Sequence, residues 1–270
     1  MIILVTGASS GIGYESAMLL ARKGHKVYGA ARRLDRMEPL RKFGITPMSL
    51  DVTSEASMQA CVAAILAAEG RIDVLVNNAG YGYFGAIENV TLDEARRQLE
   101  VNVFGLARLT QLVLPSMREH GFGRIVNVGS VVGRVVLPFG GWYHVSKYSV
   151  EALSDALRME LKPFGIDVAL IEPGGIGTEW GHIAADHLEV SCKDTPYADA
   201  ARKEARLMHF AYNSKFLSRP TVVSRAIGKA ATARHPRHRY HPGVGARLLL
   251  WLHAILPVRW WDALWRRALA

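Results

Sequence analysis

The run Thr6-Gly7-Ala8-Ser9-Ser10-Gly11-Ile12-Gly13 follows a short apolar stretch at residues 2–5 and leads into a helical pattern over residues 13–23. Short apolar runs without polar alternation are typical of strands that are buried on both faces of a sheet. Glycines between such a strand and a helix let the backbone approach a phosphate group that lies over the helix N-terminus. This stretch therefore predicts a strand, a phosphate-binding turn and a helix.

The alternation of strand and helix continues along the chain. Further apolar runs predict strands at residues 26–30, 47–50, 73–76, 124–128 and 167–171, with helical patterns between them. This order predicts an α/β fold of the Rossmann type, a doubly wound parallel sheet with helices on both faces. We expect one domain over residues 1–243, with a substrate loop at about 178–218, and an amphipathic, basic helical extension over residues 244–270.

Composition excludes several classes of protein. Half of the 270 residues are hydrophobic and 21% are charged, which excludes a disordered chain. The two cysteines, Cys61 and Cys192, are far apart, so a disulfide framework or a cysteine zinc site is not expected. The longest apolar stretch, residues 248–258, is shorter than the about 20 residues that span a bilayer. With no basic segment before the first strand, we expect a soluble cytoplasmic protein.

Several polar motifs follow the first turn in a fixed order: Asn77-Asn78-Ala79-Gly80, Asn102, Ser130, Tyr143-x-x-x-Lys147 and Pro173-Gly174. With the Thr-Gly-x-x-x-Gly-x-Gly turn, these motifs make residues 1 to about 180 resemble the classical short-chain dehydrogenase/reductase family. The resemblance implies hydride transfer between a nicotinamide cofactor and a carbonyl or alcohol carbon. It also implies a set of cofactor-binding positions, namely Gly7, Ser9, Ser10, Gly11, Ile12, Gly13, Asp51, Val52, Asn78, Ala79, Gly80, Tyr143, Lys147, Pro173, Gly174, Ile176 and Thr178.

Two arginines, Arg32 and Arg33, stand at the end of the second predicted strand, close to the adenosine ribose in a dinucleotide fold. NAD enzymes usually have a carboxylate there, which would repel the 2′-phosphate of NADP. An arginine binds this phosphate through charge-assisted hydrogen bonds, and Ser9 or Ser10 can add another. We therefore predict NADP(H) as the cofactor.

Tyr143 and Lys147 are four residues apart on a helical stretch, so both side chains project from the same face. A free tyrosine has a pKa of about 10, and a nearby ammonium favours the phenolate. We expect Tyr143 to exchange the proton on the substrate oxygen and Ser130 to bind that oxygen. By resemblance, Asn102 orients a water beside Lys147.

The predicted substrate pocket is aromatic and apolar, with Tyr81, Tyr83, Leu137, Phe139 and Trp142 as candidate lining residues. The segments around them resemble the 17β-hydroxysteroid dehydrogenase and retinol dehydrogenase branch of the family, which implies a steroid-, retinoid- or lipid-like substrate. Two alternatives stay open. One is a cofactor-bound sensor or scaffold without turnover, and the other is a reductase of acyl-thioester ketones.

The C-terminal part of the chain is strongly basic. Residues 201–270 hold 14 lysines and arginines against two acidic residues, within a net charge of +9 for the whole chain. Leucines and tryptophans recur at helical spacing within residues 244–270, which is compatible with packing on the protein or with peripheral contact at a membrane. We expect no nucleic-acid partner and no metal, although His235, His238 and His241 lie three residues apart. By resemblance, we expect a homodimer or homotetramer formed through the helices around residues 93–118 and 146–162.

Overall fold

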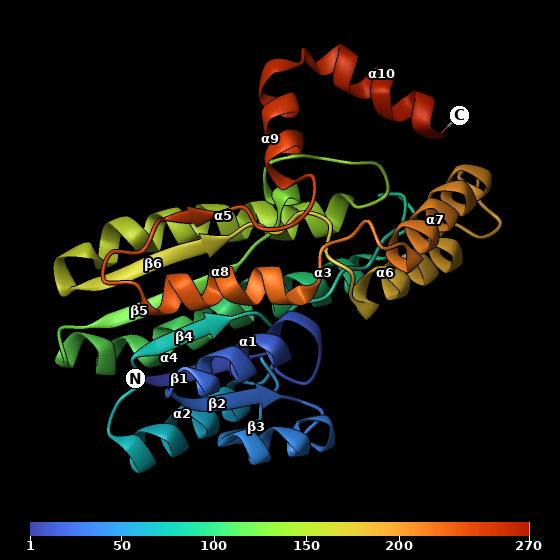
Figure 1. Ribbon diagram of the computed structural model, residues 1–270. Coiled ribbons are helices and arrows are strands. Elements are labelled where there is room, and N and C mark those ends of the chain that lie inside the picture. The colour runs from blue at the N-terminus through green and yellow to red at the C-terminus, as the bar shows by residue number, and fades with distance from the viewer. Residues whose placement is uncertain (270) are drawn as a thin grey trace.

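A parallel sheet of seven strands forms the centre of the computed structural model, which describes residues 1–269 (Figure 1). The strands are β1 (Ile2–Thr6), β2 (Lys26–Ala31), β3 (Ile45–Ser49), β4 (Val74–Asn77), β5 (Gly123–Val128), β6 (Ile166–Ile171) and β7 (Arg239–Tyr240). They lie in the order β3-β2-β1-β4-β5-β6-β7. From β1 the strands are added toward one edge of the sheet as far as β3, and from β4 they are added toward the other edge. Ligands of such sheets bind where these two halves meet, between β1 and β4, beyond the carboxyl ends of the strands.

Helices cover both faces of the sheet. On one face lie α1 (Gly11–Arg22) and α8 (Pro220–Thr232), and on the other lie α2 (Glu55–Glu69), α4 (Gly105–Glu119) and α5 (Gly141–Leu161). The other helices are α3 (Leu92–Leu99), α6 (Glu179–Ser191), α7 (Ala198–Asn213), α9 (Ala246–Ile255) and α10 (Val258–Leu269). Short turns of other helix types are η1 (Asp35–Phe43), η2 (Glu100–Phe104), η3 (Val131–Gly133) and η4 (Lys162–Phe164). The prediction of a doubly wound Rossmann-type sheet is confirmed.

Local sequence explains where several helices begin and end. The Ser54 side chain caps α2 by accepting a hydrogen bond from the Ser57 amide at 3.3 Å, and Gly70 ends the helix in the left-handed conformation with φ of 74°. Pro220 stands in the first turn of α8, where its missing N–H leaves no helical bond unmade. These signals fix the helix that follows β3 and the helix that precedes β7.

The predicted element boundaries differ from the structure by a few residues. Strand β3 begins at Ile45 rather than at residue 47, because Gly44 ends η1 in the left-handed conformation. Helix α1 begins at Gly11, two residues earlier than predicted, within the glycine turn itself. In the C-terminal region, Pro257 separates two helices, α9 and α10.

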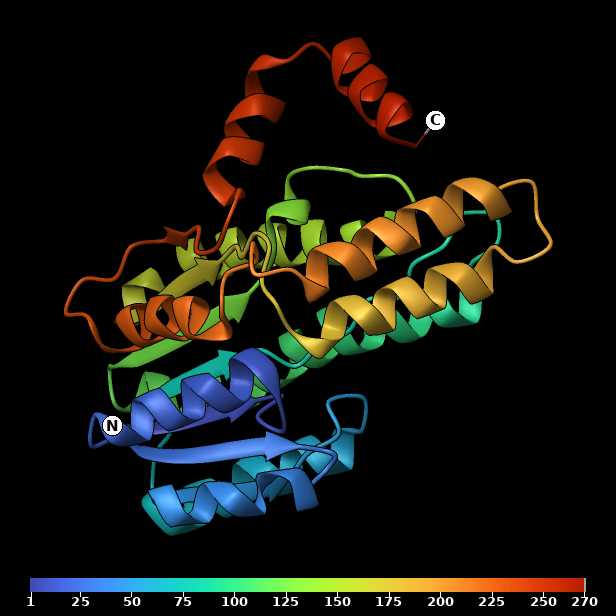
Figure 2. The same cartoon turned by 45° about the vertical axis from the view of Figure 1, so that its right-hand side comes forward.

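The helices beyond the sheet lie on the side where the strands end. α6 and α7 pack against each other, and α9 and α10 project from the body above them (Figures 1 and 2). α10 contacts α7. Among the described residues 1–269, none of the helices combines the length and the apolar character that crossing a membrane requires.

Candidate active site

The glycine turn between β1 and α1 is closely packed against the end of β4. Gly7 has a φ of 66°, and a Cβ atom at Gly13 would lie 2.3 Å from the Gly7 carbonyl oxygen. The Thr6 hydroxyl accepts hydrogen bonds from the amides of Asn78 at 2.9 Å and Ala79 at 3.0 Å. The Asn78 side chain donates to the Thr6 carbonyl oxygen at 3.0 Å. The turn is therefore preformed, and only glycine fits its two closest approaches.

The N-terminus of α1 has backbone N–H groups that can bind an anion. Ser10 is its N-cap residue, and the Ser10 side chain makes no capping hydrogen bond. Helix N-termini carry unsatisfied N–H groups and a partial positive charge, which favour a bound phosphate. The glycine cradle and this helix end together fit the pyrophosphate of a dinucleotide.

Two exposed arginines follow β2 beside this turn. Arg33 Nη2 donates to Ser9 Oγ at 3.4 Å, so the Arg33 guanidinium reaches the glycine turn. Arg32 lies close enough to Asp51 to contribute to a lowered carboxyl pKa. Burial alone would raise the Asp51 pKa, but hydrogen bonds from Thr53 and the Arg32 charge outweigh it. The end of β2 thus offers two cations where a ribose phosphate would lie.

Asn102 lies in the π-helical turn η2 and joins two loops of the site. Its side-chain amide donates to the Tyr81 carbonyl oxygen at 2.8 Å and to Ser146 Oγ at 2.9 Å, and its oxygen accepts from the Tyr81 amide at 3.0 Å. A Cβ atom at Gly80 would lie 3.0 Å from the Asn102 oxygen and 3.9 Å from Lys147 Nζ. Asn102 and Lys147 therefore both lie close to Gly80, where a side chain would crowd the Asn102 oxygen.

Tyr143 and Lys147 point inward from α5 and are buried. Lys147 Nζ donates to the Val128 carbonyl oxygen at 2.9 Å and lies 5.7 Å from the centre of the Tyr143 ring. Burial raises the pKa of Tyr143, the neighbouring Tyr212 adds to this effect, and a hydrogen bond with Ser130 opposes it. Burial also lowers the pKa of the Lys147 ammonium to about 8. The lowered Tyr143 pKa expected from the sequence stays a prediction for the cofactor-bound state.

The loop after β6 closes the cofactor side of the site. The Pro173 carbonyl oxygen accepts from the Val131 amide at 3.1 Å, next to Ser130. Ile176 is buried and pairs with Ser218, while Thr178 directly precedes α6 and its side chain makes no capping hydrogen bond. A Cβ atom at Gly11 would lie 3.6 Å from Thr178 Cγ2, so Thr178 faces the glycine turn. The glycine turn and the loop after β6, both expected to bind the cofactor, are thus neighbours in space.

Residues 1–187 match the protein-family model for short chain dehydrogenases. This chain belongs to the short-chain dehydrogenase family. It is 36% identical to the probable short-chain type dehydrogenase/reductase VdlC of Helicobacter pylori, over 97% of this chain and 96% of that protein. It is 35% identical to the 3-ketodihydrosphingosine reductase of Bacteroides thetaiotaomicron, over 90% of this chain and 87% of that enzyme.

A solved structure of a serine dehydrogenase in its closed form, complexed with NADP+, superimposes with a TM-score of 0.78. It is 28% identical to this chain, and the match covers 90% of this chain and 94% of that one.

Aromatic side chains of this dehydrogenase surround the Tyr143 ring. Trp180, at the start of α6, lies 5.0 Å from Tyr143 between ring centres, and Phe84 lies 5.8 Å from both rings. Leu249 and Leu250 of α9 pack against the same cluster. Sequence reasoning missed Trp180 and α9 as parts of the site. Trp180 could have been predicted to lie near the site, because it stands two residues after Thr178. Nothing in the sequence of α9 indicated that this helix packs against Tyr143.

The predicted lining residues lie in different places. Leu137 packs in the cluster that contains Tyr143, and the Tyr81 backbone holds Asn102. Tyr83 stacks on His187 of α6 with 4.7 Å between ring centres. Phe139, at a φ of 61°, packs instead against the cluster formed beneath α6 and α7. The indole nitrogen of Trp142 is buried without a partner among the described residues.

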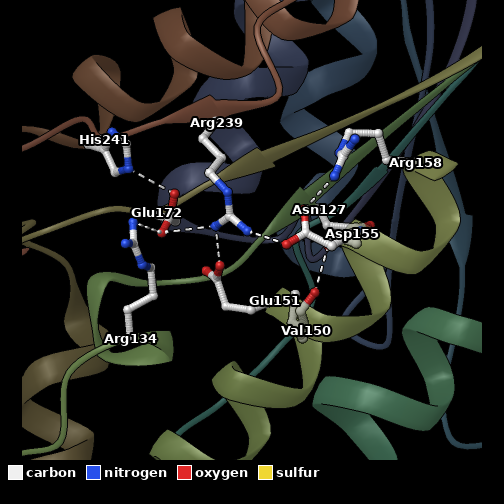
Figure 3. Close-up of polar contacts among 10 residues, drawn as sticks. Asn127, Arg134, Val150, Glu151, Asp155, Arg158, Glu172, Arg239 and His241 are labelled. Atoms are coloured by element: carbon white, nitrogen blue, oxygen red, sulfur yellow. Dashed lines mark hydrogen bonds and ion pairs between the residues drawn. The ribbon is translucent and has the colours of Figure 1, made fainter.

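Near the candidate catalytic residues lies a group of charges around two buried carboxylates, Glu151 and Glu172 (Figure 3). Arg239 of β7 pairs with Glu151 of α5, and its guanidinium also lies 3.4 Å from Glu172 Oε1 and 2.6 Å from Asp155 Oδ2. His241 Nε2 lies 2.9 Å from Glu172 Oε2. Burial raises the pKa of Glu151 to about 7, although Arg239 opposes this shift, and burial also raises the pKa of Glu172.

This charge group connects the elements that carry the candidate catalytic residues. Glu151 is one helical turn after Lys147, and Glu172 directly precedes Pro173. Arg134, which follows η3 and the Ser130 loop, lies 3.9 Å from Glu172 Oε1. Arg239 and its carboxylates therefore fix the loop after β6 and helix α5 relative to each other.

No group of three or more histidines, cysteines, aspartates or glutamates within residues 1–269 is arranged to hold a metal ion. Of the three histidines noted near β7, His241 lies against Glu172 in the charge group. Asn77 is buried, and its amide donates to Thr110 Oγ1 and Asn127 Oδ1, both at 3.0 Å. Asn77 therefore supports the sheet from within.

Proposed function

We propose that this dehydrogenase uses NADP(H) to interconvert a lipophilic alcohol and the corresponding ketone or aldehyde. The observation that carries the proposal is the buried Tyr143, whose ring centre lies 5.7 Å from Nζ of the buried Lys147, inside an aromatic and aliphatic cluster. Polar groups at one point of an otherwise apolar enclosure suit a molecule with a single oxygen function. The 3-ketodihydrosphingosine reductase relative, by its name, acts on a lipid ketone.

In the proposed mechanism, the bound nicotinamide supplies hydride chemistry and this chain supplies the proton. Ser130 Oγ and Tyr143 Oη hold the substrate oxygen. In reduction, the Tyr143 hydroxyl gives its proton to that oxygen, and a raised pKa keeps the hydroxyl protonated at neutral pH. In oxidation, the phenolate form is needed, and the nearby Lys147 ammonium favours it. Asn102 and Lys147 both lie next to Gly80, which places two polar side chains beside each other near Tyr143.

The choice of NADP(H) over NAD(H) rests on the arginines after β2. No carboxylate stands at the end of β2, and the Arg33 guanidinium already reaches Ser9 Oγ at the glycine turn. The NADP+ complex of the structurally similar serine dehydrogenase agrees with this choice. We assign the 2′-phosphate to Arg32, with Arg33 and the Ser9 hydroxyl in support.

The proposed quaternary structure is a homodimer or homotetramer through the helices around residues 93–118 and 146–162. Large apolar side chains are exposed along these helices, including Phe104 at 56%, Val145 at 45% and Tyr148 at 40%. Exposed apolar patches of this kind are typical of subunit interfaces. Sedimentation velocity of the purified protein tests this part, and a monomer at micromolar concentration would contradict it.

The function is tested by following NADPH oxidation by the purified protein against carbonyl compounds. The panel runs from small aromatic aldehydes through retinal to keto-steroids, long-chain ketones and an acyl-thioester ketone, with NADH as the paired control. Turnover with NADPH that increases toward bulky apolar carbonyls is expected. NADPH binding without turnover on any member would favour the sensor alternative, and turnover confined to acyl-thioester ketones would favour the other.

A further inference from the structure

The outer surface of α9 and α10 is apolar although it faces solvent. On α9, Leu248, Trp251 and Ile255 recur at helical spacing and are 60%, 58% and 54% exposed. On α10, Trp260 is 59% and Leu264 is 49% exposed. With Val258 at the start of α10, which is 76% exposed, two short consecutive helices that stand away from the sheet present six large apolar side chains (Figures 1 and 2).

The inner surface of the same two helices is fixed to the protein. Leu249 and Leu250 of α9 pack in the cluster around Tyr143. Trp261 of α10 is buried, and its indole nitrogen donates to the Val136 carbonyl oxygen at 3.2 Å. His253 of α9 contacts the Trp261 ring edge-on, with 5.0 Å between ring centres. The inner surface of both helices is therefore already packed on the protein. The exposed apolar residues lie on the opposite surface and do not belong to a helix that has still to pack on its own domain.

Basic side chains accompany the exposed apolar ones. Arg247, Arg259, Arg266 and Arg267 are all exposed on or beside these helices, and none of them is ion-paired with a carboxylate of the described residues. α7, which α10 contacts, carries a groove of its own lined by Arg202, Lys203, Arg206, Leu207 and Phe210, in which Arg202 pairs with Asp199. The whole surface is therefore cationic and apolar at once.

This chemistry favours a lipid surface over other occupants. Tryptophan and leucine at the boundary of the acyl chains, with arginines at the headgroups, are typical of helices that lie in a membrane interface. A second copy of this chain would bring the same arginines face to face, since a symmetric contact repeats one surface on both subunits. Neither helix has the length to cross a bilayer.

We propose that the α9–α10 hairpin, residues Ala246–Ile255 and Val258–Leu269, docks the protein on the surface of an anionic lipid bilayer. Trp251, Ile255 and Trp260 enter the boundary between headgroups and acyl chains, while the arginines contact lipid phosphates. The inner side of α9 borders Tyr143, so the docked hairpin brings the active site close to the bilayer. Delivery of a lipophilic substrate along α9 rests on the proposed function; the docking itself does not.

The test is co-sedimentation of the full-length protein with phosphatidylcholine vesicles that contain phosphatidylglycerol, and with phosphatidylcholine vesicles alone. The wild type is expected to sediment with the anionic vesicles at low salt, less at high salt, and weakly with neutral vesicles. A Trp251→Glu/Trp260→Glu double variant is expected to bind at least tenfold more weakly. The matched control is Leu92→Glu on α3, where Leu92 is also 58% exposed.

NADPH binding by each variant, measured by fluorescence titration, checks that the fold is retained without depending on turnover. A wild type that does not bind anionic vesicles at low salt would overturn the proposal. Equal binding by the wild type and the double variant would overturn it as well. Sedimentation velocity without lipid provides the remaining outcome: loss of an oligomer in the double variant would assign this surface to self-association instead.

Discussion

The indole ring of Trp180 lies 5.0 Å from the phenol ring of Tyr143, with 47° between the two ring planes. Trp180 also packs closely against the loop after β4. A Cβ atom at Gly82 in this loop would lie 2.5 Å from the indole. Helix α6 therefore covers the proposed proton donor directly, and its first turn forms part of the substrate enclosure. Aromatic pairs of this kind contribute about 0.5–1.5 kcal/mol beyond the area that they bury.

Replacement of Trp180 by alanine removes the indole ring that packs against Tyr143. Trp180→Ala is expected to raise KM for a lipophilic carbonyl by about tenfold, as loss of about 1.4 kcal/mol of binding free energy implies. The NADPH dissociation constant should change little, because Trp180 lies on the substrate side of Tyr143. Steady-state kinetics and NADPH titration of the same preparations measure both quantities. An unchanged KM with weaker NADPH binding would instead assign Trp180 to the cofactor.

Replacement of Arg32 by alanine tests the cofactor preference. Charged hydrogen bonds contribute about 1.5–3 kcal/mol, so KM for NADPH should rise about 10- to 100-fold while KM for NADH stays nearly constant. Arg41→Ala is the matched control, since Arg41 is exposed and pairs with Glu38 in η1. Equal changes for the two cofactors in Arg32→Ala would contradict the assignment of the 2′-phosphate to this residue.

The buried carboxylates make stability depend on pH. Glu151, which faces Glu172, Arg239 and, further off, Arg134 and His241, has a folded-state pKa of about 7 against an ordinary value of 4.5. A raised pKa stabilises the fold at low pH, and this contribution is lost as pH rises through about 7. We expect Glu151 to account for a decrease in unfolding free energy on the order of 1–2 kcal/mol between pH 5 and pH 8.

Urea unfolding at several pH values measures this effect. Glu151→Gln should show a smaller decrease between acid and alkaline pH than the wild type. Glu160→Gln, on the exposed side of the same helix, should behave as the wild type does. If Glu151→Gln keeps the full pH dependence, then Glu151 does not titrate in this range.

Local patterns in the sequence were sufficient to predict the sheet and to select most residues of the candidate site. The glycine turn could be predicted because Gly7 and Gly13 occupy positions that exclude a side chain, which is a requirement visible in residue type alone. That Asn102 and Lys147 lie near each other was expected only from the resemblance to the short-chain dehydrogenase/reductase family. In the Asn77-Asn78-Ala79-Gly80 motif, the resemblance assigned residues 78–80 to the cofactor, and the structure shows that the buried Asn77 amide bonds Thr110 and Asn127.

Contacts between distant parts of the chain could not be predicted. Arg239 meets Glu151 and Asp155 across 88 and 84 positions, and nothing near Arg239 in sequence indicates its partners. The packing of Leu249 and Leu250 on the Tyr143 cluster depends on the angle at which α9 leaves the Gly243–Gly245 segment. Helical periodicity shows which residues share a face, but it does not show what that face meets. The boundary proposed at residue 243 also remains a prediction.

The central claim is that Tyr143 moves the proton in an NADP(H)-dependent reaction. It is tested most directly by comparing carbonyl reduction by the wild type, Tyr143→Phe and Tyr148→Phe, with NADPH binding measured for all three. Tyr148 lies on the same helix and is 40% exposed, so it controls for loss of a hydroxyl from α5. The account predicts that Tyr143→Phe loses at least about 100-fold in kcat, binds NADPH nearly as the wild type does, and that Tyr148→Phe stays active. Wild-type turnover in Tyr143→Phe would contradict it.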